Sequence, residues 1–246
     1  MEIFKYLDEQ AASGNVALRP NAYCFAAAIH AWAYSGEPQK AKRAYELLQD
    51  MRQRYEIYGQ RSCKPNVVVF TSVINACVKP AVYEDKEMAF RIAELVFEEL
   101  VHSQYGNPNF LTYAAFLHVC GTTLEDKDER DAAVRRIFGM CRYYGCVGKI
   151  VLQKLQEAAS IELFEELMGP YDDWDDIPKS WKRRVKGERF QPDTKGANDA
   201  KSESESRSMK PLSETKSLRM VPRIPPISVR RSFSDETGKS WDIQFL

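Results

Sequence analysis

One feature of this chain constrains its fold more than any other: a short pattern that occurs three times. Each copy reads Pro-Asn, three residues, an aromatic residue, three more residues, and then Ile or Leu. The copies begin at Pro20, Pro65 and Pro108, so they are spaced by 45 and 43 residues. Because self-similarity at a period of about 20 to 50 residues is typical of repeat proteins, the pattern predicts an array of similar units.

A second, amphipathic segment follows each copy, with apolar residues at i, i+4 and i+7. These residues are Ala44, Leu48 and Met51 in the first copy, Ala93, Phe97 and Leu100 in the second, and Ala133, Ile137 and Met140 in the third. The spacing places them on one face of a helix, and charged residues fill the other face. Each unit is therefore predicted to be a pair of helices, A and B, which bury their apolar faces when units stack.

The first segment of the middle unit, KPNVVVFTSVINAC, is compatible with two secondary structures. Its three consecutive valines, 67–69, favour a strand, whereas Phe70, Ile74 and Cys77 lie at helical spacing. The corresponding segment of the first unit, AYCFAAAIHAWA, is rich in strong helix formers. Since one fold must serve all units, we predict that the segment is helix A and that the Asn after each Pro caps it.

The predicted fold is all-α: an αα-hairpin repeat solenoid, coiled as a right-handed superhelix, with a disordered C-terminal tail. Ile3, Phe4 and Leu7 match the apolar residues of the other B helices, so the chain is predicted to open within a B helix. Trp174 and Trp181 are expected to dock a closing segment on the last unit, and the tail is too polar to offset its ordering entropy. The predicted divisions are a partial unit 1–18, units 19–63, 64–106 and 107–146, a degenerate unit 147–168, a closing segment 169–190 and a disordered tail 191–246.

The composition favours no particular partner. Acidic and basic residues balance at 35 each, so the net charge alone indicates neither nucleic acid nor a membrane. No apolar run approaches the roughly 20 residues of a membrane-spanning helix. The N-terminus, MEIFKYLDEQ, resembles neither a signal peptide nor a transit peptide. We therefore expect no membrane partner.

The sequence contains no catalytic pattern that we recognise. Its six cysteines include no C-x-x-C pair, which predicts reduced, buried thiols rather than disulfides or a metal site. His30 and His118 occupy the same repeat position, which favours a packing role over a ligand role. The P-loop, nucleophile-elbow and H-E-x-x-H patterns do not occur. The sequence thus predicts no enzyme activity, cofactor, metal or small-molecule substrate.

The repeated pattern resembles that of the pentatricopeptide repeat (PPR) family, over about residues 1–160. Units of that family are αα hairpins with a Pro-Asp or Pro-Asn, an aromatic residue in helix A, and A-x-x-x-[LF]-x-x-M in helix B. Tetratricopeptide repeats differ, because they have a period of about 34 and a Trp, Gly and Tyr pattern in the first helix. The stretch DDIPKSW, residues 175–181, is similar to the Pro-x-x-Trp closing segment of some algal members. The resemblance implies a location in the mitochondrion or the chloroplast.

The resemblance also implies that the chain binds single-stranded RNA, with one base per repeat read by two or three side chains. In the family, the residue after the helix A aromatic pairs with the residue after the next unit's Pro. The pairs in this chain are Ala26 with Asn66, Thr71 with Asn109, and Ala114 with Gly148. Only Thr71 and Asn109 match a typical pair of the family, one that favours adenine, and their hydroxyl and amide can hydrogen-bond a base edge.

Two further roles follow from the resemblance. Tyr23, Val68 and Leu111 correspond to the side chains that wedge between bases, and Tyr23 can also stack on a base. Lys79 lies near the end of a helix A and is the exception among nearly uncharged A helices. It is therefore a candidate for contact with a phosphate group.

Two functions remain open at the level of the sequence. The first is sequence-selective binding of single-stranded RNA in organellar RNA processing, stability or translation, which the Thr71–Asn109 pair favours. The alternative is a protein–protein scaffold or a ribosome-associated helical repeat protein, which the near-neutral A helices favour. The expected partners are single-stranded RNA and, through the repeat surface, other proteins.

Overall fold

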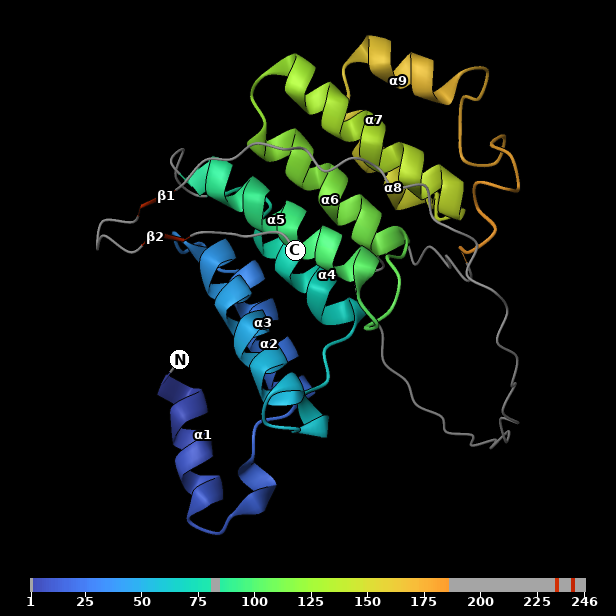
Figure 1. The fold of residues 1–246 in the computed structure, drawn as a ribbon. Helices are drawn as coiled ribbons and strands as arrows, with labels where there is room; N and C mark the ends of the chain where they lie inside the picture. Colours follow the sequence, from blue (N-terminus) through green and yellow to red (C-terminus); the bar gives the residue numbers. More distant parts are fainter. Residues whose placement is uncertain (1, 81–84, 186–232, 235–239, 242–246) are drawn as a thin grey trace, which may run out of the picture. The chain divides into compact units, whose positions relative to one another are not determined.

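The computed structural model describes residues 2–80, 85–185, 233–234 and 240–241. The chain divides into two compact parts, Met1–Pro192 and Asp193–Leu246. The helices of the described residues lie in the first part, which is a stack of helical hairpins (Figure 1). The all-α repeat fold predicted from the sequence is thereby confirmed.

Helices of the first part alternate between the A and B positions of the repeat (Figure 1). The A helices are α2 Ala22–Ala33, α4 Val67–Ala76, α6 Phe110–Thr123 and α8 Lys149–Ala158. The B helices are α1 Glu2–Ala12, α3 Lys40–Glu56, α5 Asp85–His102, α7 Lys127–Tyr144 and α9 Ile161–Met168. Two short 3₁₀ helices, η1 Val16–Leu18 and η2 Arg61–Cys63, lie in the links that precede α2 and α4.

The A helices form the tighter of the two layers. Each of α2, α4 and α6 contacts the next A helix along its backbone, whereas among the described B helices only α3 with α5 and α7 with α9 do so, over fewer residues. The B helices α5 and α7 are instead connected by long side chains, through ion pairs of Arg136. Because the more closely spaced layer lies on the inside of a curved stack, the A helices line its inner side.

The repeated residues of the pattern form the core. The aromatic residues Phe25, Phe70 and Tyr113 are at most 1% exposed. The aliphatic residues four positions later, at 29, 74 and 117, are fully buried. Phe97 of α5 packs edge-on against Tyr113, with ring centroids 5.6 Å apart. The same sequence positions therefore bury the interface between successive units.

The Asn after each Pro caps its helix, as predicted. The side chain of Asn21 accepts hydrogen bonds from two backbone amides of the first turn of α2, and Asn109 does the same for α6. Asn66 accepts one from the Val69 amide, at 3.1 Å. With this cap in place the valine run is helical, since α4 begins at Val67. Tertiary packing thus outweighs the strand propensity of the valines.

Helix α1 meets the rest of the stack through a few side chains. The rings of Phe4 and Phe25 stack with centroids 4.5 Å apart. Asp8 accepts two hydrogen bonds from the Arg54 guanidinium of α3, at 2.8 and 2.7 Å. Ile3 is 65% exposed, although Leu47, its counterpart in α3, is only 3% exposed.

The closing segment covers the start of α8. The Trp174 indole N–H donates to the carbonyl of Val147, at 2.9 Å, and the Val147 amide donates to the carbonyl of Trp181, also at 2.9 Å. The guanidinium of Arg142 lies 4.4 Å from the centre of the Trp181 ring. The predicted docking of both tryptophans is confirmed. It secures a helix whose N-cap, Gly148, has no side chain to cap it.

The second part of the chain contains one described element, a two-stranded antiparallel ladder. Strand β1, Phe233–Ser234, pairs with β2, Ser240–Trp241, and the backbone register sets Phe233 opposite Trp241. This pair lies within the stretch 191–246 that we predicted to be disordered, and its sequence had not indicated a strand. The remainder of that stretch lies outside the described residues.

Candidate RNA-binding face

One stripe on each of the first three A helices, exposed or half-buried at every position except the buried Ala115, belongs to what we call the A face. Each stripe consists of four positions at i, i+4, i+7 and i+11, which a helix places on one side. They are Tyr23, Ala27, His30 and Tyr34 of α2 and its C-terminus, Val68, Ser72, Asn75 and Lys79 of α4 and its C-terminal turn, and Leu111, Ala115, His118 and Thr122 of α6. Lys79 is the only Lys, Arg, Asp or Glu among them, so the A face is almost neutral.

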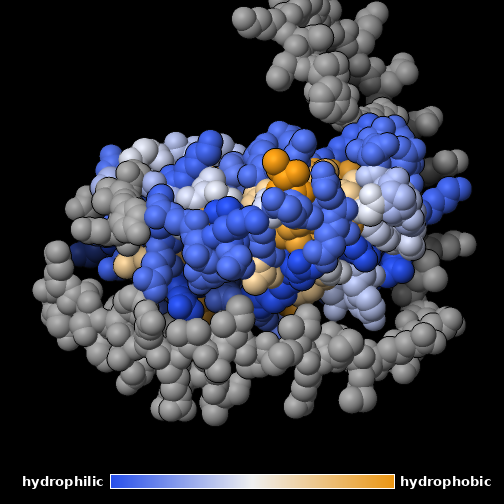
Figure 2. Space-filling view, turned by 90° about the horizontal axis from the view of Figure 1, so that it is seen from above, coloured by the Kyte–Doolittle hydropathy of each residue, from blue (hydrophilic) through white to orange (hydrophobic). Residues whose placement is uncertain are grey.

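Large apolar side chains stand in solvent at the same place in each unit. Tyr23 is 86% exposed, Val68 is 66% exposed and Leu111 is 50% exposed. All three are the second residue of their helix, two positions after the capping Asn. The positions that the sequence assigned to base wedging are therefore accessible. The described surface seen in Figure 2 is largely hydrophilic, with apolar residues in small areas.

One hydroxyl group connects Thr71 and Asn109. The Thr112 Oγ1 atom lies 2.8 Å from Thr71 Oγ1 and 3.2 Å from Asn109 Oδ1. Thr112 is fully buried, Thr71 is half-buried, and Asn109 is exposed at the start of α6. The predicted pair thus lies together at the junction of α4 and α6, held by a third side chain that the sequence analysis did not identify.

The other two predicted pairs have a different character. Ala26 is half-buried, and its partner Asn66 is exposed with its oxygen engaged by the helix cap. Ala114 is 4% exposed and belongs to the core. Its partner Gly148 is buried beside the closing segment. Among the predicted pairs, only Thr71 and Asn109 combine an exposed amide with a side-chain hydroxyl.

Lys79 lies in the turn just beyond the end of its helix A, near which the sequence placed it. Helix α4 ends at Ala76, and Lys79 follows it in the turn with a left-handed φ of 49°. Its backbone amide donates to the Thr122 hydroxyl of α6, at 3.3 Å. The side chain is exposed on the A face, so the turn still presents this cation where the sequence placed it.

Cations of the B helices are largely engaged in bonds between units. Arg54 binds Asp8, Arg52 Nε lies 3.2 Å from Glu99, and Arg136 binds Glu94 at 2.9 Å. These ion pairs run from α1 to α7 along the layer opposite the A face. Arg52 and Arg54 are thereby committed to carboxylates, which leaves them poorly suited to bind phosphates.

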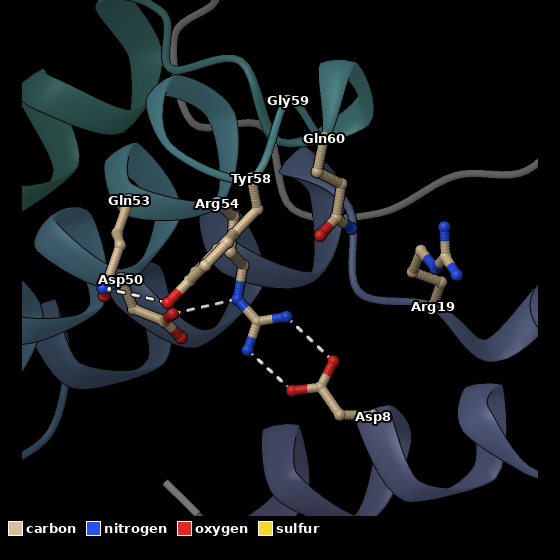
Figure 3. A pocket seen from close by; sticks show the side chains of 8 residues that line it. All are labelled: Asp8, Arg19, Asp50, Gln53, Arg54, Tyr58, Gly59 and Gln60. Carbon is tan, nitrogen blue, oxygen red and sulfur yellow. Dashed lines mark hydrogen bonds and ion pairs between the residues drawn. The ribbon is translucent and has the colours of Figure 1, made fainter.

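An open cavity of about 620 Å³ lies beside α1 and α3 (Figure 3). Its lining residues are Asp8, Arg19, Asp50, Gln53, Arg54, Tyr58, Gly59 and Gln60. The Arg54 guanidinium points into it and is held by Asp8 on one side and by Asp50, at 2.9 Å, on the other. Because its acidic and basic groups balance and largely bind one another, the cavity has no clear preference for a charged ligand.

Other kinds of site find little support in the part of the chain that the structure describes. No group of three or more His, Cys, Asp or Glu side chains is placed there to hold a metal ion. None of the described helices combines the length and apolar character needed to cross a membrane. All six cysteines are free, and five of them are buried.

The stacked hairpins and the A face define a helical-repeat protein. The family model of the pentatricopeptide repeat domain matches residues 13–80 and 61–123. Residues 13–123 therefore form a pentatricopeptide repeat domain, which implies a helical-repeat RNA-binding protein and is of a typically non-catalytic kind. No significant match was found among curated proteins or among solved structures.

Thr112 is the functional candidate that sequence reasoning missed. A comparison of the third helical residue in each unit would have found it. That residue is Cys24 in α2, Val69 in α4 and Val151 in α8, so the polar Thr112 of α6 departs from its counterparts. Asn109 followed by Thr112 is also a capping-box spacing, which the structure confirms.

Proposed function

We propose that the protein binds single-stranded RNA through its A face and reads an adenine with Thr71 and Asn109. We further propose that it acts in organellar RNA processing, stability or translation, in the mitochondrion or the chloroplast. The organellar role is supported by family membership, and base reading is supported by the geometry of one junction.

The observation that carries the proposal is the composition of the junction between α4 and α6. A polar pair, Thr71 and Asn109, meets there through Thr112, and an exposed apolar residue stands near each member in the sequence: Val68 one turn before Thr71, and Leu111 two residues after Asn109. A nucleobase needs both features: apolar contact on its faces and hydrogen-bonding groups along its edge. Because Val68 and Leu111 belong to successive units, a base placed between them would be flanked on both faces.

Stacking and hydrogen bonding would supply most of the affinity. Contact of a base with an aromatic side chain contributes about 1–3 kcal/mol per base, which makes Tyr23 the strongest single anchor on the A face. Phosphate contacts add a salt-dependent part, but the A face has only Lys79 for this purpose. The salt dependence should therefore be present but smaller than that of a strongly basic RNA-binding protein.

The test is binding of the full chain to fluorescent single-stranded RNA, followed by anisotropy. Adenine-containing strands should bind more tightly than uracil-only strands, and affinity should fall as salt is raised from 50 mM. Tyr23→Ala should weaken binding about tenfold without loss of stability. Tyr143→Ala, which removes a 63% exposed tyrosine from the B helix α7, is the matched control and should leave binding unchanged.

Two outcomes would refute the proposal: no RNA binding at 50 mM salt, or binding that is insensitive to salt. The near-neutral A face favours a protein partner as the second candidate function. If the protein is a scaffold of that kind, Tyr23→Ala should weaken binding of the protein partner, and the unmodified protein should show no preference among RNA strands.

A further inference from the structure

We propose that Thr112 is a positioning residue that fixes which member of the reading pair donates and which accepts a hydrogen bond. This inference rests on the proposed RNA-binding function and deepens it. Thr112 is fully buried, so it does not itself touch RNA. Its hydroxyl acts on a base only through Thr71 and Asn109, which it contacts at 2.8 and 3.2 Å.

The argument begins with the single hydrogen of the Thr112 hydroxyl. That hydrogen can be donated either to Asn109 Oδ1, which accepts only, or to Thr71 Oγ1, which can also donate. If it went to Thr71, the lone pairs of Thr112 and Asn109 would face each other at 3.2 Å. If it goes to Asn109, Thr71 donates to Thr112 and every contact is a hydrogen bond. Because facing lone pairs repel each other and a hydrogen bond in their place attracts, the second arrangement is the stable one.

This arrangement uses up particular atoms of the reading pair. The Thr71 hydrogen is directed at Thr112, so the Thr71 oxygen can serve a base only as an acceptor. The Asn109 oxygen accepts from the Leu111 and Thr112 amides, at 3.0 and 3.1 Å, as well as from the Thr112 hydroxyl. Only its NH₂ group is left for a base, as a donor. The pair therefore presents one acceptor, Thr71, and one donor, Asn109.

Adenine matches that order, because its exocyclic amino group donates and its N1 accepts. In the pose that sets the amino group against Thr71, both hydrogen bonds form. Inosine has the same ring system with the order reversed, since its O6 accepts and its N1–H donates. In the same pose inosine would place a lone pair against Thr71 and an N–H against the Asn109 amide. Both hydrogen bonds would be lost, with no change in stacking.

The preceding junction, between α2 and α4, lacks a hydroxyl at the position that corresponds to Thr112. Val69 takes the place of Thr112 there, and it is fully buried. Its amide still donates to the capping Asn66, at 3.1 Å. A valine is therefore compatible with this position and with the helix cap, and Thr112→Val should fold. In that variant the Thr71 hydroxyl would be free to rotate and could donate or accept.

The experiment compares RNAs that carry a single adenosine or inosine in an otherwise uracil-only strand, using the full chain. The unmodified protein should bind the adenosine strand about tenfold more tightly, as expected for loss of hydrogen bonding at one base. Thr112→Val should reduce this ratio to about twofold or less, because a rotating hydroxyl serves either base. Thr112→Ser, which keeps the hydroxyl, should restore it. Circular dichroism and thermal unfolding confirm that both variants fold.

The outcomes separate this inference from the proposed function. Absence of RNA binding by the unmodified protein defeats the proposed function and, with it, the inference. RNA binding with an unchanged adenosine-to-inosine ratio in Thr112→Val would overturn the role of Thr112 alone. The role of Thr112 would also be overturned if Thr112→Ser failed to restore the adenosine-to-inosine ratio, because selectivity would then not depend on a hydroxyl at this position.

A second variant tests the same idea by gain of selectivity. Ala26→Thr together with Val69→Thr places two hydroxyls at the preceding junction, beside the capping Asn66. The double variant should acquire a preference for adenosine over inosine at the base next to the first one, whereas Ala26→Thr alone should not. Equal selectivity in the single and double variants would contradict the role assigned to the buried hydroxyl.

Discussion

Arg136 of α7 and Glu94 of α5 form an ion pair of 2.9 Å in which each side chain is only 16% exposed. The pair spans a gap between two B helices that have no close backbone contact in the described structure. Glu98 adds a second bond to the same guanidinium, at 3.0 Å. The outer layer of the stack is therefore held together here by charge rather than by packing.

Replacing Arg136 by Met should destabilise the protein by about 1–3 kcal/mol. The substitution keeps the apolar stem of the side chain but leaves Glu94 partly buried without its cation. Arg135→Met is the matched control, because Arg135 lies on the same helix as Arg136, pairs with Glu166 of α9 and is 51% exposed. Urea unfolding should show a clearly smaller loss of unfolding free energy for Arg135→Met than for Arg136→Met. Equal losses would mean that the Arg136 pair contributes no more than a surface contact.

The packing of helix α1 against α3 should weaken at acidic pH. The Arg54 hydrogen bonds lower the pKa of Asp8, against a smaller opposing effect of burial. A carboxyl with a lowered pKa contributes stability that is complete above its unfolded value of about 3.9 and is lost as the pH falls through the folded value. NMR shifts of the α1 amides should therefore change below about pH 4, and Asp8→Asn should show the loosened state at pH 6. Glu9→Gln, on the same helix, should not.

Lys79→Asn should weaken RNA binding for every base alike. The substitution removes the only cation of the A face, so the slope of log affinity against log salt should fall by about one. Asn tolerates a left-handed backbone, and the φ of 49° should therefore cost no stability. Lys5→Asn on α1 is the control, and an equal effect there would point to general charge rather than to a phosphate contact.

Two glycine substitutions should change the stability of the protein in opposite directions. A Cβ atom at Gly121 of α6 would lie 3.1 Å from the Cα of Ala158 in α8, whereas one at Gly139 of α7 would meet nothing within 4 Å. Both gain helix propensity, worth about 1 kcal/mol. Gly121→Ala also overpacks the contact between the helices, at a cost of about 1–3 kcal/mol. Thermal unfolding should show Gly139→Ala stabilised and Gly121→Ala destabilised, and stabilisation of both would show that α8 can shift freely.

Some of the candidate site was predictable because it follows from position within a repeat. Once the copies are aligned, the exposed Tyr23, Val68 and Leu111 occupy equivalent places, and one alignment locates them all. The conformation of the turn after α4 was harder to predict from the sequence. Lys79 leaves the helix because Pro80 cannot continue it, and its backbone is held by Thr122 of another unit. Such a contact between units is not visible in the local pattern.

The sequence by itself determined the architecture: the Pro-Asn caps, the buried aromatics and the period of the repeat, because each depends on local spacing and recurs. Only the tertiary structure decided that Thr71, Thr112 and Asn109 share hydrogen bonds across two helices. It also decided that the arginines of the B helices are engaged by carboxylates of their neighbours. The physical reason is that a hydrogen bond between units depends on how the helices stack, to within a fraction of an ångström, and no residue spacing along the chain encodes that distance.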